Sequence, residues 1–304
     1  MANIFGTSGN DTLFGTSSND ILNGGLGADI MNGGDGNDTY YVDNVGDIVK
    51  ESFDDALGGT ADTVYSSVSY SLSPGTAGNQ GYGIENLYLT GSANINATGN
   101  SKNNILKGNS GSNILNGGLG ADDMNGGDGN DTYYVDNVND IVKETFDDAL
   151  GGVDTVYSSV SYSLSPGTAG NQGYGIENLY LTGVGNTSAT GNSKNNILKG
   201  NSGSNILNGG LGADDMNGGD GNDTYYVDNV NDIVKETFDD ALGGTADTVY
   251  SSVSYSLSPG TASNQGYGIE NLYLTGVGNT NATGNSKNNI LKGNSGSNIL
   301  NGGL

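Results

Sequence analysis

Every complete unit of a nine-residue repeat in this chain has Asp or Asn at its sixth place and a large apolar residue at its eighth. The first block reads GTSGNDTLF, GTSSNDILN, GGLGADIMN and GGDGNDTYY from Gly6, and the second reads GNSKNNILK, GNSGSNILN, GGLGADDMN and GGDGNDTYY from Gly99. A third block begins at Gly191 and a fourth at Gly284. Four consecutive matches in each complete block exclude a chance pattern, and tandem repeats of this kind predict a repeat architecture.

The nine-residue units lie inside a longer repeat. GGLGAD at Gly24, Gly117 and Gly209, with a truncated GGL at Gly302, gives spacings of 93, 92 and 93 residues. The one-residue difference falls at GGTADTV against GGVDTV, which marks that segment as a turn. The chain ends within a repeat, so we expect it to be a cut from a longer array. We predict a single continuous solenoid over 1–304, divided into N-terminal coils 1–32 and long repeats 33–125, 126–217 and 218–304.

Each unit predicts one turn followed by one short strand. Gly, Asn and Asp tolerate the positive φ angles of tight turns, and the next three residues form a strand whose middle side chain points inward. Two units complete a coil of about 18 residues, so the chain is predicted to be an all-β, right-handed parallel β-solenoid of the β-roll type. The predicted core ladders stack Leu13 on Met31, Leu22 on Tyr40, Leu106 on Met124 and Leu115 on Tyr133.

The rest of the long repeat continues the β pattern with interruptions. TVYSSVSYSL (63–72) alternates as a half-buried strand, and IENLYLTG (84–91) predicts another strand with its leucines inward. Loop excursions are expected around 52–62 and 73–83, and the only helical candidate is one short turn within 48–59. Tyrosines recur in each repeat; we expect core and cross-strand packing from them, with a sugar-binding stripe as the alternative. In the first repeat they are Tyr40, Tyr41, Tyr65, Tyr70, Tyr82 and Tyr88.

The composition and net charge limit the kinds of partner that the chain can bind. The formal net charge is −25, with nine lysines and no arginine, so the chain repels nucleic acid and anionic lipid and attracts cations. Low hydrophobicity with high charge is typical of disorder, but the periodic apolar residues and 18 tyrosines argue against disorder here. No run approaches the ~20 apolar residues of a membrane span, so we expect no membrane insertion. Without His or Cys the usual base and nucleophile pairs cannot form, and we expect no enzyme in this chain.

The nine-residue units resemble the repeat-in-toxin (RTX) nonapeptide GGxGxDxUx, the hemolysin-type calcium-binding repeat of secreted bacterial proteins. The intervening DTYYVDNVGDIVKE, DTVYSSVSYSL and IENLYLTG resemble the long tandem repeats of large calcium-binding proteins and adhesins. The resemblance implies several Ca²⁺ ions per chain, bacterial export and folding outside the cell. The start of the chain is not a signal peptide, so we expect an export signal in a C-terminal segment absent from this chain.

In the family, calcium lies between turns of neighbouring coils, held by sixth-place aspartates and turn carbonyls. Carried over, the candidate carboxylate ligands are Asp11, Asp20, Asp29, Asp38, Asp122, Asp131, Asp214 and Asp223. VDNVGDIVK (42–50) and its equivalents form a further unit that adds Asp47, Asp140 and Asp232. The predicted glycine ligands are Gly24, Gly33, Gly117, Gly126, Gly209 and Gly218, whereas Leu26 is not one. Predicted carboxylate pairs are Asp11 with Asp29, Asp20 with Asp38, Asp29 with Asp47, Asp122 with Asp140, and Asp214 with Asp232.

Some acidic and amide positions fall outside this scheme. No nonapeptide frame places Asp43, Asp54, Asp55 or Asp62, which we interpret as turn formers, and we interpret Glu85 as a solvated or loop-capping charge. Asparagine brings no charge to a sixth place, so those turns should bind calcium weakly or not at all and hold by side-chain amide ladders. These asparagines are Asn104, Asn113, Asn196, Asn205, Asn289 and Asn298.

The leading functional hypothesis is an extracellular structural or adhesive protein, a calcium-stiffened stalk, matrix fibre or surface-layer component. Its expected partners are calcium, other copies stacked end to end, and cell-surface or matrix polymers. One alternative is ice binding, suggested by the Thr-bearing turns at Thr7 and Thr16. Another is the calcium-binding module of a larger exported enzyme or toxin. Stacked carboxylates repel one another without metal, so the chain is expected to fold on binding calcium.

Overall fold

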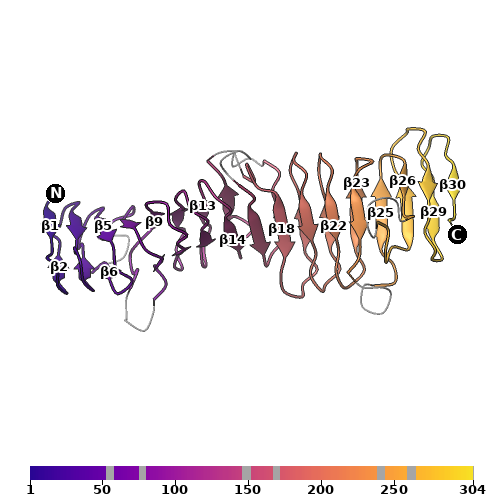
Figure 1. The fold of residues 1–304 in the computed structure, drawn as a ribbon. Helices are drawn as coiled ribbons and strands as arrows, with labels where there is room; N and C mark the ends of the chain where they lie inside the picture. The colour runs from indigo at the N-terminus through magenta and orange to yellow at the C-terminus, as the bar shows by residue number, and fades with distance from the viewer. Residues whose placement is uncertain are drawn as a thin grey trace. The chain divides into compact units, whose positions relative to one another are not determined.

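The computed structural model describes residues 1–52, 58–74, 80–145, 152–166, 172–237, 244–258 and 265–303. Among these residues the regular structure is all β, in strands of two to four residues, and no helix occurs. The chain forms two compact units, Met1–Asp154 and Thr155–Leu304. In each unit every strand pairs in parallel with a strand two places before or after it in the chain, which is the arrangement of a β-solenoid (Figure 1).

The first unit stacks its odd-numbered strands β1 to β15 in one sheet, and it stacks β2-β4-β6 and β8-β10-β12-β14 as the facing strands. Its strands are β1 (Asn3–Phe5), β2 (Thr12–Phe14), β3 (Ile21–Asn23), β4 (Ile30–Asn32), β5 (Thr39–Val42), β6 (Ile48–Lys50), β7 (Thr63–Ser66), β8 (Tyr70–Ser71), β9 (Asn86–Leu89), β10 (Ala97–Thr98), β11 (Ile105–Lys107), β12 (Ile114–Asn116), β13 (Asp123–Asn125), β14 (Thr132–Val135) and β15 (Ile141–Lys143).

The second unit repeats this arrangement, with β16-β18-β20-β22-β24, the odd strands β17 to β29, and β26-β28-β30. Its strands are β16 (Thr155–Ser158), β17 (Tyr162–Ser163), β18 (Asn178–Leu181), β19 (Ser188–Thr190), β20 (Ile197–Lys199), β21 (Ile206–Asn208), β22 (Asp215–Asn217), β23 (Thr224–Val227), β24 (Ile233–Lys235), β25 (Thr248–Ser251), β26 (Tyr255–Ser256), β27 (Asn271–Leu274), β28 (Ala282–Thr283), β29 (Ile290–Lys292) and β30 (Leu300–Asn301).

The core consists of the middle residue of each short strand, stacked coil on coil. The predicted ladders are confirmed: Leu13 pairs with Met31, Leu22 with Tyr40, Leu106 with Met124 and Leu115 with Tyr133. The unit predicted at 42–50 is also a coil, because Val49 pairs with Met31 and is fully buried. An inner strand therefore contributes only one or two buried apolar side chains, and a single coil has no core without its neighbours.

Coil length varies along the long repeat. The nonapeptide coils have the predicted 18-residue period, as in Ile21 over Thr39. Later strands pair at longer separations: Thr39 with Thr63, Thr63 with Asn86, and Asn86 with Ile105, which are 24, 23 and 19 residues apart. The sheet from β1 to β15 continues through these longer coils, whereas the facing strands β6 and β8 belong to different sheets.

One sequence prediction is corrected by the structure, and two others fall partly outside the described residues. The segment 63–72 is not one strand: a bend after Ser66, whose hydroxyl bonds to the backbone of Val68, splits it into β7 and β8 on different sheets. The helical candidate 48–59 begins as strand β6, while 53–57 lie outside the described residues. The end of the predicted excursion 73–83 returns to the solenoid, since the N–H of Gly81 donates to the carbonyl of Val49 (2.7 Å); residues 75–79 lie outside the described residues.

Five of the six recurring tyrosines of the first repeat pack against one another or in the core, whereas Tyr82 is exposed. Tyr40 and Tyr70 are buried, whereas Tyr41 and Tyr65 stack at 5.5 Å between ring centroids on the outer face of β5 and β7. Tyr88 meets Tyr65 edge to face at 5.5 Å, and the ammonium of Lys107 lies 4.5 Å from the Tyr88 ring centroid. Because the rings face each other along the ladder, this arrangement favours cross-strand packing over an open sugar-binding stripe.

Equivalent strands of successive long repeats fall in different sheets of the first unit. The strand IMN is β4, and its equivalent DMN in the next repeat is β13, nine strands later. Since a step of nine strands is odd, β4 belongs to the even series and β13 to the odd sheet. The turn edges and outer faces of the second long repeat are therefore exchanged relative to those of the first.

Candidate metal sites

Carboxylates form a ladder along the turn edges. The backbone N–H of Asp20 donates to Oδ1 of Asp38 (2.6 Å), that of Asp38 to Oδ1 of Asp62 (2.6 Å), and that of Asp62 to Oε2 of Glu85 (3.0 Å). At the other edge Asp11 and Asp29 donate in the same way to Asp29 and Asp47. The N–H groups of Asp122 and Asp214 donate to Asp140 and Asp232, so all five predicted carboxylate pairs are neighbours in the structure.

The second carboxylate oxygen divides the predicted ligands into two groups. In one group Oδ2 accepts hydrogen bonds within its own turn, as in Asp20, where Oδ2 accepts from the N–H (2.6 Å) and hydroxyl (2.7 Å) of Thr16. This group contains Asp11, Asp20, Asp47, Asp140 and Asp232. In the other group Oδ2 is buried and has no hydrogen-bond partner. That group contains Asp29, Asp38, Asp122, Asp131, Asp214 and Asp223.

The second glycine of each GG turn explains this division. In the GT turn at Gly15, the N–H of the second residue, Thr16, satisfies the aspartate. In the GG turn at Gly24, Gly25 has φ +81°, and its N–H donates instead to Asn23 Oδ1 (3.0 Å). Oδ2 of Asp29 therefore has no donor from its own turn and is buried without a hydrogen-bond partner. A buried carboxylate oxygen without a donor is what a hard cation would satisfy, so the GG turns fit calcium.

The first glycine of each GG turn leaves room for that carboxylate. A Cβ on Gly24 would overlap the Asp29 carboxylate, and a Cβ on Gly33 would overlap both Asp38 and the Tyr40 hydroxyl. The same overlap with a sixth-place aspartate occurs at Gly117, Gly126, Gly209 and Gly218. The role of these glycines as carbonyl ligands stays a prediction, but their lack of a side chain is required by the carboxylate beside them.

In the asparagine turns the polar side-chain atoms have hydrogen-bond partners without a metal ion. Oδ1 of Asn104 accepts the N–H of Asn100 (2.7 Å), and its Nδ2 donates to the carbonyls of Ile84 (3.3 Å) and Glu85 (3.1 Å) in the preceding coil. Nδ2 of Asn113 donates similarly to Ile95 (2.6 Å). The predicted amide ladder is thus built from amide-to-backbone bonds between coils rather than from stacked amides.

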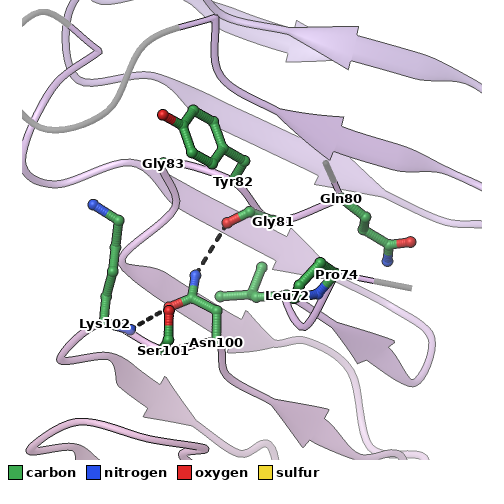
Figure 2. A pocket seen from close by; sticks show the side chains of 9 residues that line it. All are labelled: Leu72, Pro74, Gln80, Gly81, Tyr82, Gly83, Asn100, Ser101 and Lys102. Carbon is green, nitrogen blue, oxygen red and sulfur yellow. Dashed lines mark hydrogen bonds between the residues drawn. The ribbon is translucent and has the colours of Figure 1, made fainter. Parts of the chain in front are cut away.

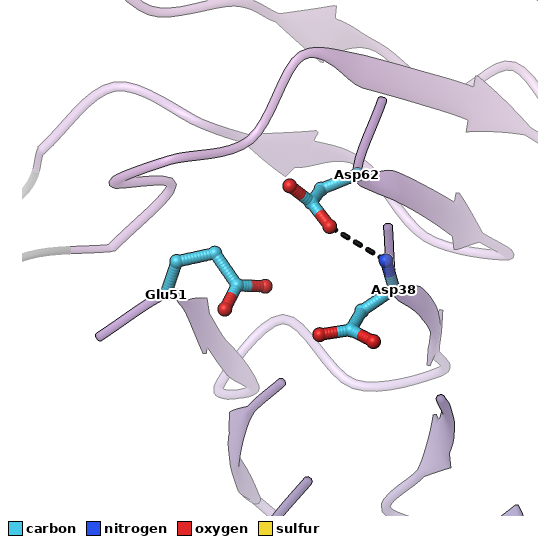
Figure 3. A group of neighbouring side chains, drawn as sticks. All are labelled: Asp38, Glu51 and Asp62. Atoms are coloured by element: carbon cyan, nitrogen blue, oxygen red, sulfur yellow. Dashed lines mark hydrogen bonds between the residues drawn. The ribbon is translucent and has the colours of Figure 1, made fainter. Parts of the chain in front are cut away.

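A group of three buried carboxylates recurs in each long repeat. Oxygens of Asp38, Glu51 and Asp62 lie within 4.8 Å of one another, and the three residues are 1%, 3% and 0% exposed (Figure 3). Glu51 accepts the Tyr40 hydroxyl and the N–H of Gly34 (2.8 Å). The equivalent groups are Asp131, Glu144 and Asp154, and Asp223, Glu236 and Asp247.

Burial shifts the acidities of these groups. Loss of solvation is the main cause, and it raises the pKa of Asp38 to about 6 and the pKa values of Glu51 and Asp62 to about 8. Burial likewise raises the pKa values of Asp122 and Asp214 to about 7. In the absence of metal these carboxyl groups would hold protons near neutral pH, and a bound cation would replace those protons.

Sequence reasoning missed the glutamates of these groups and assigned Asp62 to the turn formers. Two features of the sequence indicated these residues. Glu51 lies 18 residues after Gly33, at the first place of a nine-residue unit, where the motif has glycine. Asp62 directly precedes TVY, just as Asp38 directly precedes TYY. Asp43 is exposed, and its N–H donates to Asp47 (3.2 Å), as expected of a turn former. Asp54 and Asp55 lie outside the described residues. Glu85 caps the N–H of Asp62 and pairs with Lys102 (3.2 Å).

A hollow of about 310 Å³ lies beside residues 80–83, where the chain rejoins the solenoid (Figure 2). Its lining residues are Leu72, Pro74, Gln80, Gly81, Tyr82, Gly83, Asn100, Ser101 and Lys102. Nδ2 of Asn100 donates to the carbonyl of Gly81 (3.0 Å) across one side of it. No carboxylate is among these lining residues, so the hollow does not contribute to the metal sites.

Comparison with known families agrees with this geometry. The profile of the RTX calcium-binding nonapeptide repeat matches the chain four times, over residues 5–40, 98–133, 190–225 and 274–304. The first three of these stretches contain the GG turns with buried, donor-free aspartate oxygens. Comparison with curated proteins finds no match. Within the described ranges, no helix has the length and hydrophobicity needed to cross a bilayer.

Proposed function

The chain is an RTX calcium-binding repeat protein, and from this premise we propose that it is an extracellular structural element, a solenoid whose coils are held together by calcium. The observation that carries the proposal is the recurrence, in every long repeat, of buried aspartate oxygens without a donor at the edge between neighbouring coils. A calcium ion at these edges would supply positive charge and take the buried oxygens as ligands. The residues that would hold it are the sixth-place aspartates of the GGLGAD and GGDGND turns.

The chain's own residues link metal binding to stacking. Each sixth-place carboxylate of the donor-free group uses Oδ1 to accept an N–H of the preceding coil, as Asp38 does for Asp20 (2.6 Å), and keeps Oδ2 for the metal. A carboxylate that holds a cation is thereby fixed in the position that also holds the coil beneath it. Calcium binding and folding are therefore one process in this proposal, as in other metal-dependent small repeats.

The proposal assigns no catalysis to this chain. The sequence contains no His and no Cys, and the buried carboxylates repeat in register rather than forming one unique dyad. It also places the protein outside a bacterial cell, at the surface or in a matrix, because a solenoid that needs calcium to fold stays unfolded where free calcium is low and folds after export. End-to-end stacking of copies into a fibre and attachment to cell-surface or matrix polymers belong to the same proposal.

Circular dichroism during a calcium titration tests the calcium-dependent fold. We expect a largely disordered chain in chelator and a β spectrum in calcium, with no such change in magnesium at the same concentration. A chain equally β-structured in chelator at pH 8 would contradict the proposal. Electron microscopy of the calcium-bound protein then tests the fibre, because discrete monomers at high concentration would limit the function to a single stalk segment.

The two alternatives make different predictions. Ice binding requires a flat array of free threonine hydroxyls, but those of Thr7 and Thr16 donate to Asp11 (2.8 Å) and Asp20 (2.7 Å). No observation therefore favours ice binding, and measurable thermal hysteresis would be needed to restore it. A module of a larger exported enzyme or toxin would share the calcium-dependent folding, and fusing the chain to a catalytic domain should then restore calcium-dependent secretion of that domain.

A further inference from the structure

We propose that each long repeat contains a second kind of calcium site, centred on a glutamate that takes the place of a turn glycine. Its ligands in the first repeat are Asp38, Glu51 and Asp62 (Figure 3). The equivalent ligands are Asp131, Glu144 and Asp154 in the second repeat, and Asp223, Glu236 and Asp247 in the third. The inference rests on the proposed calcium binding and adds to it a site that the nine-residue motif does not contain.

The position of the glutamate is constant and specific. Glu51 follows Gly33 by 18 residues, so it occupies the first place of the next turn, where the motif has glycine. Glu144 follows Gly126 and Glu236 follows Gly218 at the same distance. A first-place glycine lies directly beside the sixth-place carboxylate of its own turn. A side chain at this place in the next coil therefore lies near that sixth-place aspartate, and in all three repeats it is a glutamate whose carboxylate meets two buried aspartates.

The geometry leaves oxygens directed to a common centre. Oδ1 of Asp62 accepts the N–H of Asp38 (2.6 Å), while Oδ2 of Asp38 and Oδ2 of Asp62 are buried without a hydrogen-bond partner. Both side chains are at least 99% buried, and a ligand oxygen of each lies within 4.8 Å of one on Glu51. Oδ2 of Asp223 and Oδ2 of Asp247 are in the same state in the third repeat.

Glu51 is held for this role by two donors. The Tyr40 hydroxyl donates to one of its oxygens and the N–H of Gly34 to the other (2.8 Å). Each oxygen keeps a further lone pair for a cation, and the side chain cannot rotate away without breaking both bonds. Tyr40 is a positioning residue here, fully buried beside the proposed ion, and Gly34 provides its N–H because its φ of +101° turns that group away from Asp38.

Charge and hydration select calcium. No lysine forms an ion pair with Asp38, Glu51 or Asp62 in the described part of the chain, so three buried carboxylates share one unneutralised space. Such a group needs a cation of at least double charge. Three carboxylates provide up to six oxygens, which suits the six to eight ligands of Ca²⁺, whereas Mg²⁺ usually retains several waters, for which these nearly fully buried side chains leave little access.

The test removes the glutamate charge and retains its shape. The triple variant Glu51→Gln, Glu144→Gln and Glu236→Gln is compared with a control of equal charge change, Asp35→Asn, Asp128→Asn and Asp220→Asn, at the third place of the same turns. Bound calcium is counted by equilibrium dialysis on the 304-residue chain at saturation, with circular dichroism as the check of folding. We expect the glutamine variant to lose three ions per chain and the control to lose none.

A second readout locates the ion. Terbium replaces calcium in oxygen sites and luminesces when a nearby tyrosine is excited, so the glutamine variant should lose most of its tyrosine-sensitised emission. Tyr40→Phe with Tyr133→Phe and Tyr225→Phe should reduce this emission and weaken calcium binding at the three glutamate sites, because each glutamate loses the hydroxyl that positions it. If the triple glutamine variant does not fold, Glu144→Gln alone should lose one ion and keep the other two glutamate sites.

The outcomes separate this inference from the proposed function. A folded glutamine variant, triple or single, that binds as many calcium ions as the wild type overturns the glutamate site and leaves the calcium-bound turns intact. A wild-type chain that binds no calcium overturns the proposed function itself. Equal loss of ions in the glutamine variant and in its aspartate control would also overturn the site, because the effect would then come from net charge.

Discussion

At the scale of single residues, the second place of each turn decides whether the sixth-place aspartate is available to a metal. Threonine at that place donates its N–H to Asp20 Oδ2 (2.6 Å), whereas Gly25 turns its N–H toward Asn23 (3.0 Å) and leaves Asp29 Oδ2 without a donor. Positive φ is the physical reason, since only glycine adopts it without strain. Aspartate alone is therefore a weak indicator of a site, and the pair GG with aspartate is a strong one.

We predict that Gly118→Ala removes one calcium site. Gly118 has φ +83°, and a Cβ would also overlap the carbonyl of Asn100, so the turn must rearrange and its N–H can return to Asp122. The left-handed conformation alone costs about 1–2 kcal/mol for a residue with a Cβ. Equilibrium dialysis should show one ion fewer and urea unfolding in saturating calcium a lower stability. Gly185→Ala is the control, because its φ is ordinary and its nearest neighbour is 3.9 Å away; equal effects of both changes would contradict the explanation.

We predict that the calcium-free fold is more stable in acid than at pH 8. The folded chain raises the pKa of Asp38 to about 6 and the pKa values of Glu51 and Asp62 to about 8, while these groups lose their protons near pH 4 in the unfolded chain. Between these values the folded state binds more protons, so stability is present below about pH 4 and is lost as the pH rises through 6 to 8. Thermal unfolding in chelator at several pH values measures it.

Saturating calcium should reverse this pH dependence. The ion displaces the protons from the folded state, so the calcium-bound fold should lose stability as the pH falls and protons compete for the carboxylates. Calcium-free stability that increases steadily from pH 5 to pH 8 would contradict the buried-carboxylate explanation.

At the scale of the strand, one inward residue and one outward residue supply most of the stabilisation. Strands of three residues bury a single side chain, such as Leu22 or Leu106, and cannot be stable alone. Where the nonapeptide glycines stop, the outer face carries the tyrosine ladder Tyr41, Tyr65 and Tyr88 instead. The ladder therefore covers the coils that contain the long insertions.

We predict that Tyr65→Ala destabilises the calcium-bound chain by about 1–3 kcal/mol, since it removes two aromatic pairs of about 0.5–1.5 kcal/mol each. The partners lost are Tyr41 and Tyr88, each 5.5 Å away between ring centroids. Urea unfolding in saturating calcium measures the change. Tyr65→Phe keeps the rings and should stay close to the wild type, and calcium stoichiometry should be unchanged in both. A Tyr65→Ala chain as stable as the wild type would show that the ladder serves another purpose.

At the scale of the molecule, each coil is bonded to the next by the same carboxylates that would bind calcium. Hydrogen bonds link four residues in one continuous series, in which each backbone N–H donates to the carboxylate of the next coil: Asp20, Asp38, Asp62 and Glu85. A coil that binds metal thereby fixes its neighbour, which is the condition for cooperative folding in a repeat protein. The exchange of edges after nine strands places equivalent sites on both edges of the first unit, so both edges are held.

We predict that calcium-induced folding is cooperative, with a Hill coefficient above about 2, because nearest-neighbour coupling makes each bound coil a template for the next. The calcium dependence of the far-ultraviolet circular dichroism signal measures it. Replacing Asp38 by Asn should lower the coefficient as well as the ion count, since it weakens a link shared by two coils. A hyperbolic titration with independent sites would contradict the coupling.

The sequence by itself determined the parallel solenoid, the inward ladder of residues such as Leu22 over Tyr40, and the turns that pair Asp29 with Asp47. It did so because the side chains of a stacked coil repeat with the period of the chain. Whether 1–304 forms one continuous solenoid stays a prediction.

Only the tertiary structure decided which of those aspartates keep a free oxygen, that TVYSSVSYSL bends into two strands, and that Glu51 meets Asp38 and Asp62. The reason is physical. The glutamate and the second aspartate are separated by an insertion of variable length, and hydrogen-bond donors are assigned by the φ of a neighbouring glycine. Neither can be read from the period, since both depend on how one coil lies upon the next.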